Sequence, residues 1–248
     1  MIQDKSITVW FSCGTASATA AFLTLEKYGG SNNIRIVNNP VKEEHPDNER
    51  FLLDMEDFLG VKIEKCANPK YPGNSAFDVW ERRRYMSGVA GAPCTLELKK
   101  NARLLWEKEN HSDHIVLGFT VEESERHRRF SLTERNDVIP VLIDENYTKQ
   151  DCFDFINSIG IEPPAIYKMG FPNANCIGCV KATSPTYWNL VREKFPDVFQ
   201  QRAIQSRKIG SRLVRVKGQR LFLDQLKVTD TGRPLKEYSF ECGIFCEE

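Results

Sequence analysis

The stretch that decides the fold is Ile7-Thr8-Val9-Trp10-Phe11-Ser12-Cys13-Gly14-Thr15-Ala16-Ser17. Its first five residues are β-branched or aromatic, which favours a strand, and the small residues after them favour a tight turn. Apolar residues continue at helical spacing through Leu25, so the segment predicts strand, turn and helix. Backbone N–H groups and a helix N-terminus can face an anion in such a turn. Ser12 to Ser17 is therefore a candidate phosphate loop.

The same turn has a plainer explanation, because many strand–helix turns contain Ser and Gly for steric reasons. Two better-known nucleotide motifs are missing, the glycine-rich dinucleotide pattern and the Walker lysine. We therefore expect neither a flavin nor an NAD cofactor.

Strands and helices alternate beyond this turn. Further strands are predicted at 34–37, 61–66, 115–118 and 138–143. Helices are predicted from an Asp47 N-cap to a Gly60 stop, and over 149–158. This alternation is typical of βαβ units, so we predict an α/β fold with a mostly parallel central sheet flanked by helices.

The character of the chain changes near Pro163-Pro164. A Cys-x-x-Cys pair follows, then a helix that begins at Ser184-Pro185 and a hairpin around Lys217-Gly218-Gln219. We predict a nucleotide-binding domain over 1–170 and a Cys-rich appendage over 171–248 that closes over the site.

The 34 Lys and Arg residues balance the 34 Asp and Glu residues among the 248. This balance excludes a global field that attracts nucleic acid or membrane. No stretch approaches the ~20 apolar residues of a membrane helix, and the first ten residues lack a secretory-signal pattern. We expect a cytoplasmic protein with no membrane partner.

One local window departs from this balance. It holds seven basic residues and no acidic one: Arg202, Arg207, Lys208, Arg212, Arg215, Lys217 and Arg220. Such a basic stripe can bind nucleic acid phosphates, bind substrate phosphates, or simply be solvated. All three interpretations stay open.

Several motifs together resemble a known family. Ser12 to Ser17 resembles the PP-loop of the adenine nucleotide alpha-hydrolase superfamily, and Gly118-Phe119-Thr120-Val121-Glu122-Glu123-Ser124-Glu125-Arg126 resembles a segment of its phosphoadenylyl-sulfate (PAPS) reductase branch. Cys94 to Lys100 and Glu241 to Phe245 resemble two further segments of that branch. The resemblance is greatest to the members common in phages and mobile elements.

This resemblance implies a site and a reaction. Its nucleotide-binding residues map onto Ser12, Cys13, Gly14, Thr15, Ser17, Gly118, Arg126 and Lys99. The implied ligand is an adenine nucleotide: ATP, adenylyl sulfate (APS) or PAPS. In the implied reaction the Cys242 thiolate attacks the sulfur of the sulfonucleotide, and a thioredoxin-like donor resolves the product.

Three departures from the family pattern bear on the reaction. Ala16 stands where ATP-using members usually have a magnesium-binding Asp. Phe245 replaces the His of the reductase terminus, and Pro93 replaces the first Cys of a Cys pair. A rival interpretation is an ATP pyrophosphatase that adenylates a nucleic acid or small molecule for sulfur insertion. A non-catalytic nucleotide sensor is a third.

A reducing compartment disfavours disulfides among the eight cysteines, so the clustered ones are interpreted as metal ligands or redox groups. Cys176-x-x-Cys179 can present two thiolates to one centre, and Cys242-x-x-x-Cys246 can add more. The resemblance implies a 4Fe-4S cluster held by Cys94, Cys176 and Cys179, with Cys242 or Cys246 as the fourth ligand. Structural zinc and thiols without metal remain alternatives. The others, Cys13, Cys66 and Cys152, are predicted to be small buried residues.

Overall fold

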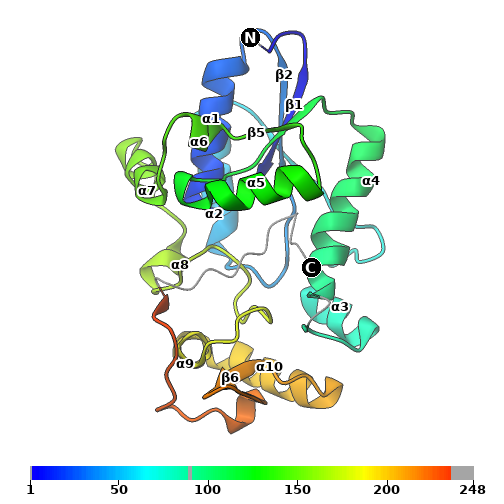
Figure 1. Cartoon of the computed structure of the whole chain (residues 1–248), viewed down its shortest axis with the longest axis vertical. Coiled ribbons are helices and arrows are strands. Elements are labelled where there is room, and N and C mark those ends of the chain that lie inside the picture. Colours follow the sequence, from blue (N-terminus) through cyan, green and yellow to red (C-terminus); the bar gives the residue numbers. More distant parts are fainter. Residues whose placement is uncertain (1, 89–90, 236–248) are drawn as a thin grey trace. The chain divides into compact units, whose positions relative to one another are not determined.

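The computed structural model describes residues 2–88 and 91–235, which form two compact units (Figure 1). The sheet unit takes its described residues from 1–40, 46–66 and 103–165. The cysteine unit takes them from 41–45, 67–102 and 166 onward. The division therefore differs from a single boundary at 170. Residues 67–102 join the cysteine unit because Val79, Trp80 and Met86 are buried in its core.

Within the described residues, five parallel strands form one sheet in the order β3-β2-β1-β4-β5. They are β1 (Ser6–Phe11), β2 (Asn33–Asn38), β3 (Ile63–Lys65), β4 (His114–Val116) and β5 (Val138–Ile139). The strand order reverses beside β1, where β1 pairs with both β2 and β4. Ligands of open α/β sheets bind at the carboxyl ends of the strands at such a switch point. The predicted parallel α/β sheet is confirmed.

Helices cover this sheet. They are α1 (Thr15–Tyr28), α2 (Asp47–Leu59), α4 (Asn101–Glu109), η2 (Val121–Glu123), α5 (Ser124–Thr133), α6 (Val141–Asp144) and α7 (Lys149–Ser158). The first of them, α1, packs on β1 and against α6 and α7. The core between sheet and helices is apolar, with Val9, Phe51 and Met55 fully buried.

Several predicted boundaries are shifted, and two of these differences have a clear physical reason. The strand predicted over 138–143 ends at Ile139, because Pro140 has no N–H for the ladder and Val141 begins α6. Asp47 is not an N-cap but the first residue of α2, after Pro46. Its carboxylate instead accepts from Arg50 Nε at 2.7 Å and from the Ala165 backbone N–H at 2.7 Å.

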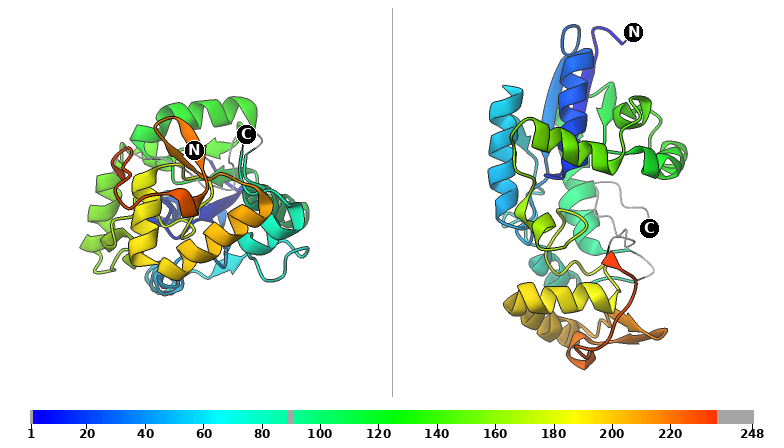
Figure 2. Two further views of the ribbon diagram at one scale, coloured as in Figure 1. Left: turned by 90° about the horizontal axis from the view of Figure 1, so that it is seen from below. Right: turned by 90° about the vertical axis from the view of Figure 1, so that its left-hand side faces the viewer.

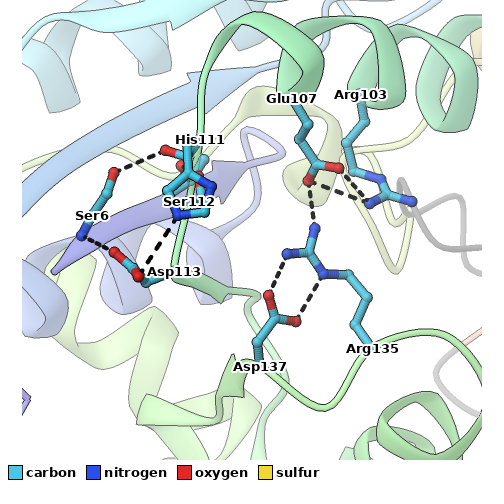
Figure 3. A network of polar contacts seen from close by, with 9 residues as sticks. Ser6, Arg103, Glu107, His111, Ser112, Asp113, Arg135 and Asp137 are labelled. Carbon is cyan, nitrogen blue, oxygen red and sulfur yellow. Dashed lines mark hydrogen bonds and ion pairs between the residues drawn. The ribbon is translucent and has the colours of Figure 1, made fainter.

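A charged network fixes α4 to the chain before β5 (Figure 3). Arg103 Nη1 donates to Glu107 Oε2 at 3.0 Å, and Arg135 Nη1 donates to Glu107 Oε1 at 2.6 Å. Arg135 also pairs with Asp137, directly before β5. Each of the two arginines therefore has a carboxylate partner inside the sheet unit.

The cysteine unit is mostly helical. It contains α3 (Ala76–Arg83), the π-helix η1 (Thr95–Lys100), α9 (Pro185–Lys194), α10 (Pro196–Ile209), β6 (Val214–Val216), β7 (Gln219–Leu221) and η3 (Leu223–Gln225), and α8 (Ala165–Lys168) leads into it. Helices α9 and α10 lie side by side (Figure 2). The predicted hairpin is confirmed, with Lys217 and Gly218 both at positive φ in its turn. The core of the cysteine unit is built around Trp80, Tyr187 and Trp188.

Among the described residues, none of the helices has the length and apolar character that crossing a membrane requires.

Candidate nucleotide site and cysteine centre

The Ser17 hydroxyl organises the predicted phosphate loop. Ser17 Oγ accepts from the Ser12 backbone N–H at 3.1 Å and from Ser12 Oγ at 3.2 Å, and donates to the Gly14 carbonyl at 2.9 Å. No side-chain hydrogen bond caps α1 in the described structure, and its first turn holds no acidic residue. The positive end of the α1 dipole is therefore left for an anion.

Gly118 packs directly against this loop. A Cβ at Gly118 would lie 2.8 Å from the Ser17 backbone nitrogen and 3.0 Å from the Ala16 carbonyl carbon. Those distances are shorter than real Cβ contacts, so only glycine fits without a shift. The two motifs predicted from sequence to share a site, Ser12 to Ser17 and Gly118 onward, therefore meet at the carboxyl end of β1 and β4.

The backbone of the loop is strained at Cys13. Its φ of 58° lies in the left-handed region, which is uncommon for a non-glycine residue. Asn38, at the end of β2, donates from Nδ2 to the Phe11 carbonyl at 2.8 Å and contacts Cys13 Sγ at 3.6 Å. Sequence reasoning missed Asn38. The available signal was an amide directly after the apolar run of β2, at the sheet edge where ligands bind.

Arg126 belongs to the segment that begins at Gly118. Its Nη1 donates to Glu123 Oε1 at 2.7 Å, and its Cζ lies 5.0 Å from the centroid of the Phe119 ring. A capping box at Thr120 and Glu123 shapes the turn before α5. Arg126 is therefore held on the sheet unit, in the same segment that packs against the loop.

The cysteines of the sheet unit are buried, as predicted for Cys13, Cys66 and Cys152. Burial raises the pKa of the Cys66 thiol to about 11 and that of the Cys152 thiol to about 12. Both thiols stay protonated at neutral pH in the metal-free protein, which fits a packing role.

Lys99 lies in the other unit. It is part of η1, and its Nζ lies 3.4 Å from Glu44 Oε1 in an ion pair whose two side chains are 7% and 10% exposed. The structure thus groups Lys99 with the cysteines, while the remaining predicted nucleotide-binding residues belong to the sheet unit.

Three predicted cysteine ligands share one buried core. Cys94 is the residue directly before η1, and Cys176 and Cys179 flank a turn with Gly178 at a φ of 67°. The buried Tyr187 hydroxyl accepts from the Cys179 backbone N–H at 2.9 Å and donates to the Cys176 carbonyl at 3.3 Å. A side chain of α9 therefore sets the shape of the Cys-x-x-Cys turn.

Arg202 is buried beside this turn. Its guanidinium carbon lies 4.3 Å from the centroid of the Trp80 ring, and its Nη1 donates to Gln205 Oε1 at 2.8 Å. A Cβ on Gly178 would lie 3.8 Å from Arg202 Nε. Cys94 and Cys176 lie within electrostatic range of the guanidinium, whose pKa burial lowers. Sequence reasoning placed Arg202 in the basic stripe, so this burial is a correction.

The basic stripe is not one continuous exposed surface. Arg207 pairs with Asp224 at 2.7 Å, and Lys208 pairs with Glu81 at 2.5 Å. Both acidic partners lie outside the 202–220 window, so counting charges within it could not find them. Arg212, Arg215, Lys217 and Arg220 remain exposed.

No three His, Cys, Asp or Glu side chains within residues 2–88 and 91–235 are arranged to hold a single metal ion. Two predicted residues, Cys242 and Cys246, lie outside the described residues. Cys94, Cys176 and Cys179 thus share a core without forming a mononuclear site by themselves.

No protein-family profile and no curated protein sequence matches the chain. Among solved structures, the U34-tRNA thiolase NcsA from Methanococcus maripaludis, with its 4Fe-4S cluster, is similar with a TM-score of 0.50 at 10% identity, over 99% of this chain and 84% of that one. The PAPS reductase from Candida auris, in a phosphate complex, gives a TM-score of 0.48 at 10% identity, over 68% and 80%. Identity this low bears on the fold alone. The similarity to NcsA shows a shared α/β fold, in agreement with the parallel sheet predicted from the sequence.

Proposed function

We propose that this chain is an enzyme that binds an adenine nucleotide at Ser12 to Ser17 and carries out sulfur chemistry with its cysteines. One observation carries the nucleotide part: the uncapped start of α1 meets Gly118, where a Cβ would lie only 2.8 Å from the Ser17 backbone nitrogen. Close backbone packing around open N–H groups suits a phosphate, which accepts several hydrogen bonds at once.

The leading reaction is attack on an adenylyl-sulfate nucleotide. The Cys242 thiolate would bond to the sulfur of the sulfonucleotide while the sulfur–oxygen bond to the nucleotide phosphate breaks. The nucleotide leaves with that electron pair, and an S-sulfonate remains on Cys242. A dithiol reductant of the thioredoxin type would then release sulfite and become a disulfide. Closure of the C-terminal segment over the nucleotide belongs to this proposal.

The proposed cofactor is a 4Fe-4S cluster held by Cys94, Cys176 and Cys179, with Cys242 or Cys246 as the fourth ligand. The residues fit such a group for two reasons. Thiolates are the ligands that iron–sulfur clusters require, and the buried Arg202 Nε beside the turn has no hydrogen-bond partner in the described structure. When bound, the cluster would tune the electrostatic field around the sulfate.

A second candidate is ATP-dependent thiolation of a nucleic acid or small molecule. The fold similarity to a tRNA thiolase extends over 99% of this chain, which favours it. The exposed Arg212, Arg215 and Lys217 offer a positive surface for a polyanionic acceptor. Ala16 weighs against it, because no carboxylate stands there to hold magnesium.

Nucleotide binding and product analysis test these proposals. Protein purified without oxygen is titrated with ATP, APS and PAPS, and then assayed for sulfite with a dithiol reductant and for pyrophosphate with ATP. The leading reaction predicts sulfite from APS or PAPS, abolished in Cys242→Ser while nucleotide binding persists. Pyrophosphate release without sulfite would select thiolation instead. A folded Gly14→Val variant with unchanged affinity for all three nucleotides would refute the loop assignment.

A further inference from the structure

Arg202 carries a buried charge that no salt bridge within the described residues neutralises. Its side chain is 3% exposed, and an arginine stays protonated in proteins. Burying such an ion costs free energy unless a charge partner and hydrogen bonds compensate for it. Compensation must therefore come from the groups that surround the guanidinium.

Three of the surrounding groups compensate for it only in part. The Trp80 ring lies under the guanidinium, and Gln205 accepts one hydrogen bond but is neutral. Glu43 lies within electrostatic range, yet no carboxylate among the described residues forms a salt bridge with Arg202. The Glu43 carboxylate instead accepts from Ser75 Oγ at 2.8 Å and from two backbone N–H groups at the start of α3, at 2.7 and 3.1 Å.

The remaining neighbours are sulfur groups and a phenol. Cys94, Cys176 and Tyr187 lie within electrostatic range of Arg202. The Tyr187 hydroxyl already forms hydrogen bonds with the backbone of Cys179 and Cys176. Neutral thiols are weak acceptors, whereas metal-bound thiolates and cluster sulfides are anionic and accept strongly. The Nε–H of Arg202, which has no partner among the described residues, lies on the side of that turn.

We propose that Arg202 is the positioning residue for an anionic metal–thiolate centre at Cys94, Cys176 and Cys179, offsetting its negative charge and donating Nε–H to one of its sulfurs. This inference rests on the metal centre of the proposed function but assigns a role to a residue outside the ligand set. It also explains why Arg202, alone among the seven basic residues of the 202–220 window, is buried in the core.

The test compares Arg202→Met, which removes the charge, with Arg202→Lys, which keeps it. Arg192→Met is the matched control. Arg192 lies on α9, and its guanidinium carbon is 4.3 Å from the centroid of the Phe199 ring. No cysteine of the described residues lies within electrostatic range of it. Iron, sulfide and zinc are measured per chain, followed by metal retention against a chelator. Removal of a neighbour that supports metal ligands weakens metal binding by about 10- to 100-fold. We expect that loss in Arg202→Met, partial rescue in Arg202→Lys and no change in Arg192→Met.

Two further readouts separate this role from simple packing. The melting temperature is measured with and without metal, and the gain on metal binding should shrink in Arg202→Met, whereas lost packing would lower both temperatures equally. If the centre is a cluster, its midpoint potential should become more negative in Arg202→Met, because a nearby cation favours the reduced, more negative form.

Each outcome has a distinct meaning. Iron with sulfide identifies a cluster and zinc alone identifies a zinc–thiolate centre, and either supports the proposal when Arg202→Met weakens it. Metal binding that is equal in wild type and Arg202→Met overturns the role of Arg202 and leaves the proposed function standing. Wild-type protein that binds nucleotide but never binds metal overturns the centre and Arg202 together, and leaves the nucleotide site standing.

Discussion

Two buried arginines, one in each unit, are treated differently by their surroundings. Arg103 in the sheet unit has Glu107 at 3.0 Å, and that carboxylate is shared with Arg135 (Figure 3). Arg202 in the cysteine unit has a neutral amide and an aromatic ring instead. The sheet unit pairs its buried arginine directly with a carboxylate, whereas in the cysteine unit Glu43 acts on Arg202 only at a distance and two thiols lie within electrostatic range. The positive charge of Arg202 would offset the negative charge of the proposed metal–thiolate centre.

The largest effect should come from a cysteine of the proposed centre. Cys179→Ser should lose nearly all bound metal, because a hydroxyl is a poor ligand for iron or zinc and the remaining thiolates would repel one another. Cys152→Ser is the control: the Cys152 thiol, with a pKa of about 12, lies in the sheet unit and should leave metal content unchanged. Elemental analysis measures the metal bound per chain. Equal metal content in the two variants would show that Cys179 is not a ligand and that the cysteine unit does not hold the metal centre.

Gly118→Ala should act on the sheet unit alone. Its new Cβ would meet Ser17 N at 2.8 Å, so the loop must shift at a cost of about 1–3 kcal/mol, and nucleotide affinity should fall at least tenfold. Gly30→Ala is the control, because a Cβ there meets nothing within 4 Å. Calorimetric titration with the bound nucleotide gives the affinity. Metal content should stay at the wild-type level, and its loss would show that the two sites are not independent.

Asn38→Ala should weaken the loop without a steric clash. It removes the donor to the Phe11 carbonyl and the contact with Cys13, which costs about 1–3 kcal/mol for a buried group left unsatisfied. Urea unfolding measures the loss, and nucleotide affinity should fall several-fold. Asn157→Ala, on the exposed side of α7, should change neither. Unchanged affinity in Asn38→Ala would mean that the left-handed Cys13 conformation holds without Asn38.

The smallest effect should be a pH dependence from Asp137. Burial opposes ionisation of this carboxyl, but hydrogen bonding and charge from Arg135 outweigh it and lower its pKa below the ordinary value. A lowered folded-state pKa adds stability above the unfolded pKa, which is about 3.9, and that stability is lost as pH falls through the folded value. The free energy of unfolding should therefore drop below about pH 4. Asp137→Asn should flatten this slope, while the exposed Asp57→Asn should keep it.

Local patterns predicted most of the sheet unit. The pattern from Ile7 to Leu25 indicated β1, the loop and α1, and the family resemblance, not a local pattern, pointed to Gly118, which packs against the loop. Patterns could not predict the length of β5, because a proline inside an apolar run decided it. Neither could they show that Arg202 faces inward or that Glu81 pairs with Lys208, since both depend on packing between distant segments.

The order in which the residues of the two units occur has a consequence for synthesis on the ribosome. Cys94 is translated 82 residues before Cys176, and the stretch between them includes the whole third segment of the sheet unit, 103–165. At about 5–20 residues per second, Cys94 and the apolar side chains around Trp80 wait roughly 4 to 16 seconds for their partners. The nascent chain therefore completes its β-sheet while Cys94 and the apolar side chains around Trp80 are not yet packed against the residues from 166 onward.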